Sequence, residues 1–140
     1  MPRHCFTYGS LMCDDIMAAV CGTAYPGQPA RLAGHVRHPV QDEAYPGMVP
    51  GPGTVVGVLY RNVDDAALAQ LDRFEGPYYE RRTVTVTLDD GSPVEAETYL
   101  FRPQYAYLLQ PGEWDVAAFL ARGKADFTAR YVGYSRIESA

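Results

Sequence analysis

The alternation of apolar and polar residues predicts a chain built mainly of strands. Residues 79–88 and 94–101 each alternate with the two-residue period of a half-buried strand, and residues 89–92 between them have the composition of a tight turn. Arg3–Tyr8 has the pattern of a further short strand, and Thr54–Tyr60 is apolar and rich in β-branched side chains. Neighbouring hairpins favour antiparallel pairing. We therefore expect an α+β fold, a small mixed, mostly antiparallel β-barrel flanked by two or three helices.

Helical periodicity accounts for much of the remaining chain. Residues 14–22, 64–76 and 113–121 are expected to form helices, and residues 124–131 are a candidate for another. Aspartates begin the first two of these segments, and a glycine ends each of them, as helix-capping chemistry requires.

Prolines and glycines mark the expected interruptions. The region 23–40 is expected to hold a strand that is interrupted around residues 26–29. Tyr45–Gly47 and Pro50–Gly53 are rich in proline and glycine, so we expect both to be turns or loops.

Glu75 is the most informative residue of the helix expected over residues 64–76. On a helical projection it lies within about 20° of Leu68, on the apolar face of the helix. That face comprises Ala67, Leu68, Leu71, Phe74 and Glu75. Glutamate is almost never buried unless it is paired or functional, so an inward Glu75 needs an explanation.

Two explanations of an inward Glu75 are open. Burial and the negative end of the helix dipole both raise the pKa of this carboxyl group, which suits a general base that works near neutral pH. Alternatively, Glu75 forms an ion pair with Arg81 or Arg82, which follow closely in the sequence. The helix by itself does not choose between them.

Composition restricts the class of protein and its partners. The chain has 140 residues, of which 47% are hydrophobic and 21% charged, so residues 1–140 are expected to form a single globular domain. A net charge of -5 argues against nucleic acid or an anionic membrane as a partner. The chain shows no secretory leader and no apolar stretch long enough to cross a membrane. Because the three cysteines also make no disulfide framework, we expect a cytoplasmic location.

Other candidate sites lack the spacing that their chemistry needs. His35 and His38 are three residues apart in an expected strand, so they point to opposite faces and make a poor metal pair. Ser10 lacks glycines two residues to either side, which the elbow around a serine nucleophile requires. We therefore expect neither a metal site nor a serine hydrolase.

Two short segments resemble those of a known superfamily. Thr7–Met12, at the end of the first strand, is similar to the substrate loop of the γ-glutamylcyclotransferase-like superfamily. Leu71–Gly76, followed by Tyr79–Arg81 and a valine-rich strand, is similar to that superfamily's catalytic-glutamate segment. Their order and spacing resemble the AIG2-like branch, which has related stretches at Tyr45–Gly47 and Gly112–Asp115. The resemblance extends from Arg3 to about Phe127 and implies a γ-glutamylcyclotransferase-like barrel.

The resemblance also implies an activity and a site. Members of the superfamily cyclise γ-glutamyl amides to 5-oxoproline and release an amine or amino acid, with no metal or redox cofactor. Glu75 would be the general base, and the substrate would bind at Tyr8, Gly9, Ser10, Leu11, Met12 and Cys13. Leucine at position 11, where some branches have asparagine, leaves the substrate open. A non-catalytic member that binds a small amino-acid-like ligand or a protein partner in the same pocket is the alternative.

Overall fold

The strands close into a barrel in a computed structural model that describes residues 3–124. They are β1 (Arg3–Thr7), β2 (Gly27–Pro39), β3 (Pro46–Val63), β4 (Tyr79–Leu88) and β5 (Pro93–Phe101). Around the barrel they follow the order β1-β3-β2-β4-β5, and neighbours are antiparallel except for β1 and β5. The predicted mixed, mostly antiparallel barrel and the β4–β5 hairpin are confirmed.

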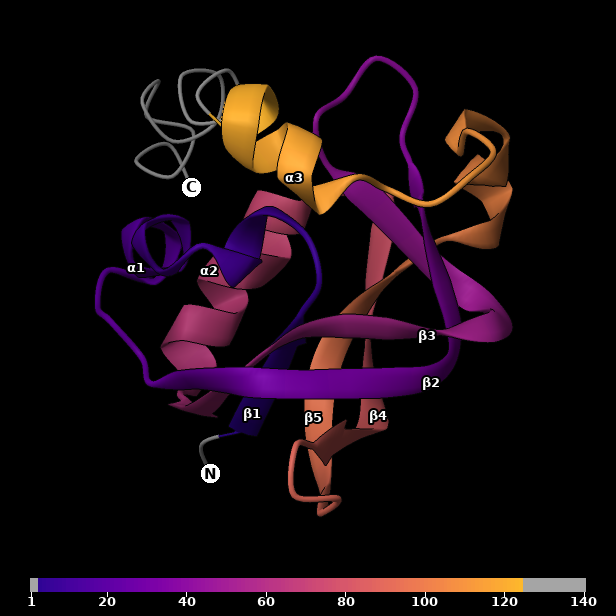
Figure 1. Cartoon of the computed structure of the whole chain (residues 1–140). Coiled ribbons are helices and arrows are strands. Elements are labelled where there is room, and N and C mark those ends of the chain that lie inside the picture. Colours follow the sequence, from indigo (N-terminus) through magenta and orange to yellow (C-terminus); the bar gives the residue numbers. More distant parts are fainter. Residues whose placement is uncertain (1–2, 125–140) are drawn as a thin grey trace.

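Helices flank the barrel, as expected. Within the described residues these are α1 (Asp14–Cys21), α2 (Asp65–Glu75), α3 (Val116–Ala118) with the π-helical turn η3 (Phe119–Gly123), and the 3₁₀ helices η1 (Ser10–Met12) and η2 (Pro103–Leu108). Figure 1 shows α1 and α2 next to each other on one side of the barrel. None of the helices in residues 3–124 has the length and apolar character needed to span a membrane. Of the candidate helix at 124–131, all but Lys124 lies outside the described residues.

The capping residues explain the bounds of α2, which were predicted correctly. The side chain of Asp64 accepts a hydrogen bond of 2.8 Å from the N–H of Ala67, and Gly76 ends the helix with a φ of 80°. Ala67, Leu68 and Leu71 are buried, whereas Phe74 and Glu75 are half-buried. Glu75 is thus the last residue of a helix whose apolar face packs inward.

The expected turns at Tyr45–Gly47 and Pro50–Gly53 are wrong, because β3 begins at Pro46 and runs through both segments. Pairing of β3 with β1 is confined to residues 58–63, so residues 46–56 pair with β2 alone. A strand with a partner on one side only tolerates proline, because one of its edges needs no N–H donors. Sequence composition shows the prolines but not the number of partners that a strand has.

The last helix starts later than expected. Asp115 caps it by accepting a hydrogen bond of 3.0 Å from the N–H of Ala118, so residues 113–115 precede the helix and do not belong to it. Trp114 and Phe119 are both buried, with ring centroids 5.2 Å apart, so they anchor this part of the chain in the core.

Two apolar clusters lie on either side of the barrel wall. One draws on every strand and so fills the barrel, with Phe6, Ala30, Leu59, Val86 and Ala96 among its members. The other joins the outer face of the barrel to α1 and α2, through Cys5, Ile16 and Leu68. Cys5 and Phe6, which are neighbours in β1, therefore face opposite clusters. The end of β1 lies between the cluster inside the barrel and the cluster beneath the helices.

Gly57→Ala is expected to destabilise the barrel by about 2 kcal/mol or more. A Cβ at position 57 would collide with the carbonyl oxygen of Thr7 in β1, and backbone cannot move aside as a flexible side chain can. Chemical denaturation would measure the loss. Gly91→Ala is the control, because nothing lies near its Cβ position and its φ of +88° costs about 1 kcal/mol for alanine. Equal losses in the two variants would contradict the expectation.

Candidate active site

A small hollow opens where the chain leaves β1. Its walls are Phe6, Thr7, Tyr8, Gly9, Ser10, Leu11, Tyr45, Pro46, Glu75, Tyr79 and Tyr99. The fold thus brings Tyr8, Gly9, Ser10 and Leu11 together with Glu75, although α1, β2 and β3 separate them in the sequence. These residues were the core of the site expected from the sequence.

Met12 and Cys13 do not line the hollow. Both are half-buried and pack against the cluster between the barrel and the helices. Cys13 occupies the N-cap position of α1, and Met12 closes the turn of η1. They support the loop from behind, and the structure does not place them with the residues that line the hollow.

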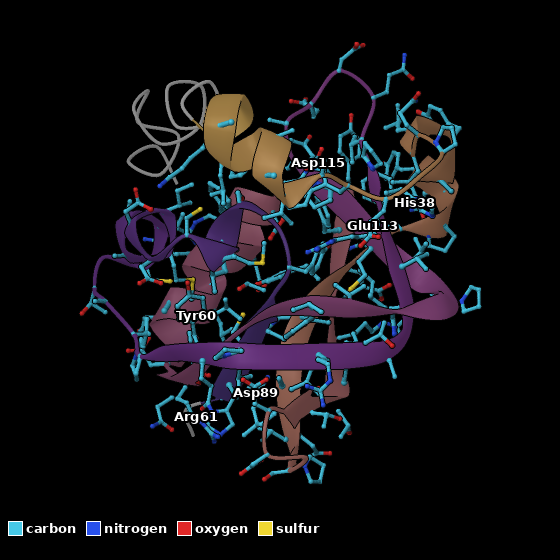
Figure 2. All side chains as sticks on the ribbon, in the orientation of Figure 1. His38, Tyr60, Arg61, Asp89, Glu113 and Asp115 are labelled. Atoms are coloured by element: carbon cyan, nitrogen blue, oxygen red, sulfur yellow. The ribbon has the colours of Figure 1, made fainter. Side chains whose placement is uncertain are left out.

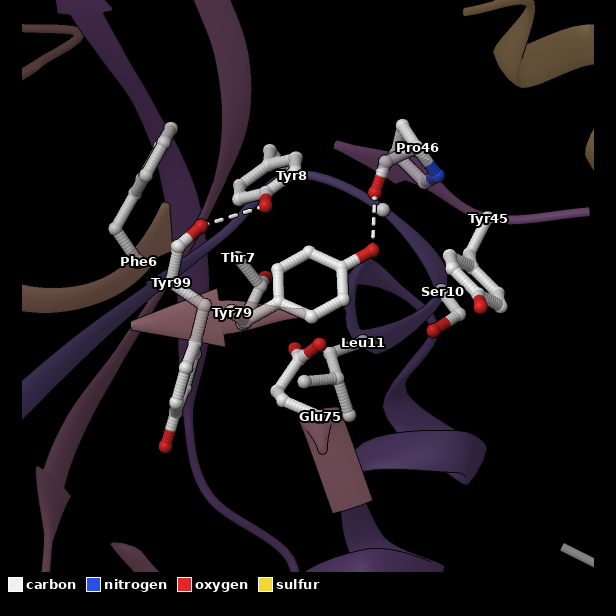
Figure 3. Close-up of a pocket in the computed structure, with 11 residues that line it drawn as sticks. Phe6, Thr7, Tyr8, Ser10, Leu11, Tyr45, Pro46, Glu75, Tyr79 and Tyr99 are labelled. Atoms are coloured by element: carbon white, nitrogen blue, oxygen red, sulfur yellow. Dashed lines mark hydrogen bonds between the residues drawn. The ribbon is translucent and has the colours of Figure 1, made fainter. Parts of the chain in front are cut away.

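Glu75 reaches the hollow from the end of α2. Figure 3 shows its carboxylate directed toward Tyr79 and the segment that holds Thr7 and Leu11. Burial, followed by the charge of Glu75, raises the pKa of Tyr8 well above its ordinary value. Burial also raises the pKa of Tyr79, with smaller contributions from Tyr8 and Glu75. The carboxylate is therefore close enough to influence both phenols.

The two arginines considered as partners of Glu75 form ion pairs with other carboxylates. The Nε of Arg81 lies 3.2 Å from Asp72 Oδ1, and its Nη1 lies 3.7 Å from Glu97 Oε1. Arg82 pairs with Glu80 at 3.1 Å. Both arginines therefore have carboxylate partners other than Glu75.

Three tyrosines give the hollow its shape, and sequence analysis did not identify them as a group. The hydroxyl of Tyr8 donates to the carbonyl of Tyr99 at 2.6 Å, and that of Tyr79 donates to the carbonyl of Pro46 at 2.7 Å (Figure 3). Tyr99 in turn donates to Asp72 Oδ1 at 2.6 Å, and burial raises its pKa far above the usual range. Near neutral pH all three phenols are uncharged donors.

Two carbonyl groups of the loop that follows β1, those of Gly9 and Ser10, accept hydrogen bonds within its own turn. The N–H of Met12 donates to the carbonyl of Gly9 at 3.0 Å, and the N–H of Cys13 donates to that of Ser10 at 3.1 Å. Among the described residues, the N–H groups of Gly9, Ser10 and Leu11 have no backbone acceptor, as the first N–H groups of a helical turn have none. Donors of this kind suit an anionic group.

Gly9 permits this loop to pack tightly. A Cβ at position 9 would lie 2.7 Å from Cδ of Pro46, so any larger residue would push the loop and the β2–β3 hairpin apart.

In residues 3–124 no group of three or more His, Cys, Asp or Glu side chains is arranged to hold a metal ion. The site thus combines one carboxylate, a set of N–H donors and neutral phenols, which is equipment for proton transfer beside an oxyanion.

The chain is similar to several known proteins. The family described as gamma-glutamyl cyclotransferase, AIG2-like, matches residues 5–116. The AIG2-like protein C of Arabidopsis thaliana is 31% identical over 140 residues, covering 96% of this chain and 81% of its own. A solution structure of an Arabidopsis thaliana protein has a TM-score of 0.70 at 28% identity, covering 99% of this chain and 85% of that chain. A structure titled gamma-glutamyl cyclotransferase has a TM-score of 0.66 at 20% identity, covering 77% of this chain and 76% of that one, and shows a shared fold.

Tyr99→Phe is expected to make the stability of the protein less sensitive to alkaline pH. The folded state holds the Tyr99 proton above the ordinary pKa of about 10. The stabilisation is therefore complete below about pH 10 and is lost as pH rises toward the folded-state pKa. Above about pH 10, the variant should lose about 1.4 kcal/mol less per pH unit than the wild type.

Urea denaturation on both sides of this pH measures the slope. At neutral pH the variant should be weaker by about 1 kcal/mol, because the hydrogen bond to Asp72 is absent. Tyr107→Phe, at a side chain that is 74% exposed, is the matched control. Identical alkaline slopes for Tyr99→Phe and the wild type would show that Tyr99 is not held neutral by the fold.

Proposed function

The chain belongs to the gamma-glutamyl cyclotransferase, AIG2-like, family, and we propose that it is an enzyme that cyclises a γ-glutamyl amide to 5-oxoproline. The products would be 5-oxoproline and a free amine or amino acid. One observation carries the proposal: Glu75 lines a single hollow together with Gly9, Ser10 and Leu11, whose N–H groups have no backbone acceptor within the described residues.

The reaction is intramolecular, so its main requirements are a base and an oxyanion site. The α-amino nitrogen of the substrate attacks the side-chain carbonyl carbon and forms a new C–N bond. The nitrogen must lose a proton to do so, and the original amide C–N bond breaks when its nitrogen receives one. A single carboxylate can accept the first proton and return it to the leaving amine.

Glu75 is the side chain suited to that role. It is the only carboxylate that lines the hollow within residues 3–124, and no histidine, cysteine or lysine lines it there. Tyr8, Tyr79 and Tyr99 have raised pKa values, so they retain their protons near neutral pH and do not compete as bases. Proton transfer in this hollow therefore falls to Glu75.

The loop supplies the complementary half of the chemistry. The tetrahedral intermediate carries a negative oxygen, and N–H donors fixed in advance stabilise it without reorganisation. Gly9, Ser10 and Leu11 offer such donors on the wall of the hollow that Glu75 also lines. The same donors suit the α-carboxylate of a γ-glutamyl group.

Glu75→Gln should abolish turnover while the protein keeps its fold. A screen of γ-glutamyl amines and γ-glutamyl amino acids for released 5-oxoproline would be run in a chelating buffer on wild type and variant. We expect kcat to fall by at least about a thousandfold, because the amide cannot accept a proton. Stability should be unchanged or slightly higher, since a neutral isostere removes the cost of desolvating the carboxylate.

Glu80→Gln is the matched control for this experiment. Glu80 is also half-buried and lies near Glu75 in the sequence, but it pairs with Arg82 outside the hollow. It should keep wild-type turnover. Full activity in Glu75→Gln would remove Glu75 from the chemistry. No 5-oxoproline from any compound, together with tight binding of one of them, would favour the non-catalytic alternative.

Gly9→Ala should lower kcat/KM by about a hundredfold, because a Cβ at position 9 displaces the loop and a misplacement of about 1 Å has that effect. The double variant Gly9→Ala/Pro46→Ala removes the Cγ and Cδ atoms that the new Cβ would meet. Steady-state kinetics on both single variants and the double variant form a mutant cycle. Recovery of activity in the double variant is expected, and simple additivity would contradict the steric account.

A further inference from the structure

A buried arginine lies behind the loop, outside the hollow. Arg37, in β2, is 7% exposed, and its Nη1 donates to the carbonyl of Tyr8 at 2.6 Å and to that of Val56 in β3 at 3.1 Å. Arg37 is absent from the walls of the hollow, so it does not touch what the hollow holds. The carbonyl of Tyr8 that its guanidinium binds nevertheless belongs to the peptide group that joins Tyr8 to Gly9.

That peptide bond sets the direction of an N–H group in the site. In a planar trans peptide the C=O of one residue and the N–H of the next point in opposite directions. The carbonyl of Tyr8 points to Arg37, so the N–H of Gly9 points away from Arg37. Gly9 lines the hollow and Arg37 does not, so a Gly9 N–H that points away from Arg37 is placed to serve the hollow.

Glycine at this position makes an external anchor necessary. Contact with Pro46 demands a residue without a side chain, and a residue without a side chain leaves the backbone free to rotate. The strong hydrogen bond from a charged donor holds the Tyr8–Gly9 peptide in one orientation. A cation on the carbonyl side also polarises the peptide and makes its N–H a better donor to an anion.

The segment before α3 encloses Arg37. The Trp114 ring lies 5.5 Å from the guanidinium carbon, and the N–H of Trp114 donates to the carbonyl of Arg37 at 3.3 Å. Glu113 Oε1 lies 3.9 Å from the Arg37 Nε, a buried atom that has no hydrogen-bond partner within the described residues. Figure 2 shows the 113–115 segment passing over β2, with Glu113 close to His38. Arg37 is thus fixed from both sides.

We propose that Arg37 is a positioning residue for the reaction, which orients and polarises the Gly9 N–H toward the developing oxyanion and is itself held by Trp114 and Glu113. Only the expected effect of Arg37 on kcat rests on the proposed function. The orientation of the peptide is a property of the free protein and is testable without any substrate.

The kinetic test compares Arg37→Met and Arg37→Lys with the wild type. Loss of one oxyanion donor lowers kcat by about 100-fold, so Arg37→Met should show this loss with KM changed by less than about threefold. Arg37→Lys keeps the charge but not the fork of donors, so it should lose only about tenfold. Arg61→Met, toward the opposite end of the barrel from Glu113 in Figure 2, is the control, because Arg61 bonds to Gln28 and should not affect turnover.

The substrate-free test uses NMR on the same variants. The carbonyl ¹³C of Tyr8 and the amide ¹⁵N of Gly9 should move in Arg37→Met, in part in Arg37→Lys, and not in Arg61→Met. If Arg37→Met does not fold, Arg37→Lys alone tests the proposal. It should then show a loss of kcat of about tenfold and a shift of the same two resonances. Unchanged kcat, or Tyr8 and Gly9 resonances that stay where they are in the wild type, would overturn the proposal.

The two arms separate the failure of this inference from that of the proposed function. A wild type that releases no 5-oxoproline from any γ-glutamyl compound would remove the function, and the resonances of Tyr8 and Gly9 would still test the anchor. Active wild type with an equally active Arg37→Met would remove the positioning role and leave the function intact.

Discussion

The seam between β1 and β5 is the constraint on which the site depends. These strands are the only parallel neighbours among the described strands, and a single residue pair, Cys5 with Glu97, defines their register. Side chains complete the closure: Thr98 donates to the carbonyl of Phe6 at 2.9 Å, and Tyr8 donates to that of Tyr99. The last of these bonds lies where β1 ends and the loop that lines the hollow starts. A polar bond that closes the barrel therefore also fixes the first residue of the loop.

Charge is distributed unevenly around this seam. Asp72, Arg81 and Glu97 form a chain of ion pairs on the outer side of α2 and the barrel. On the inner side, Glu75 is surrounded by phenols that burial keeps neutral. The positively charged Arg37 lies behind the loop. Its guanidinium bonds to the carbonyl of Tyr8, so a single peptide group stands between this cation and Gly9. Among the described residues that line the hollow, Glu75 is the only carboxylate, and none is an arginine or a lysine.

Capping residues and helical periodicity are local signals and predict α1 and α2, and the alternation of strand residues predicts the barrel. The meeting of Glu75 with the loop is implied by the family resemblance and not by these local signals. Sequence analysis fails where the outcome depends on partners that are distant in the chain. The prolines at positions 46, 50 and 52 suggest turns, yet they lie in a strand with a neighbour on one side only. Tyr79 and Tyr99 lie in expected strands, and only the folded structure shows that both line the hollow. Their hydroxyl groups donate to Pro46 at the start of β3 and to Asp72 in α2. Arg37 gives no signal at all, because its partners come from β3 and the end of β1.

The single-partner stretch of β3 has an evolutionary consequence. Tyr45 and Pro46 lie at the tip of the β2–β3 hairpin, and they form a wall of the hollow opposite the end of α2. Because residues 46–56 pair with β2 alone, mutations and length changes in the hairpin leave the remaining strand pairs undisturbed. The rim of the hollow at Tyr45 can therefore vary between descendants without re-pairing the barrel, whereas Pro46, which packs against Gly9 and accepts from Tyr79, ties the hairpin to the loop. One scaffold can in this way change the edge of its hollow while it keeps the strand pairing beneath.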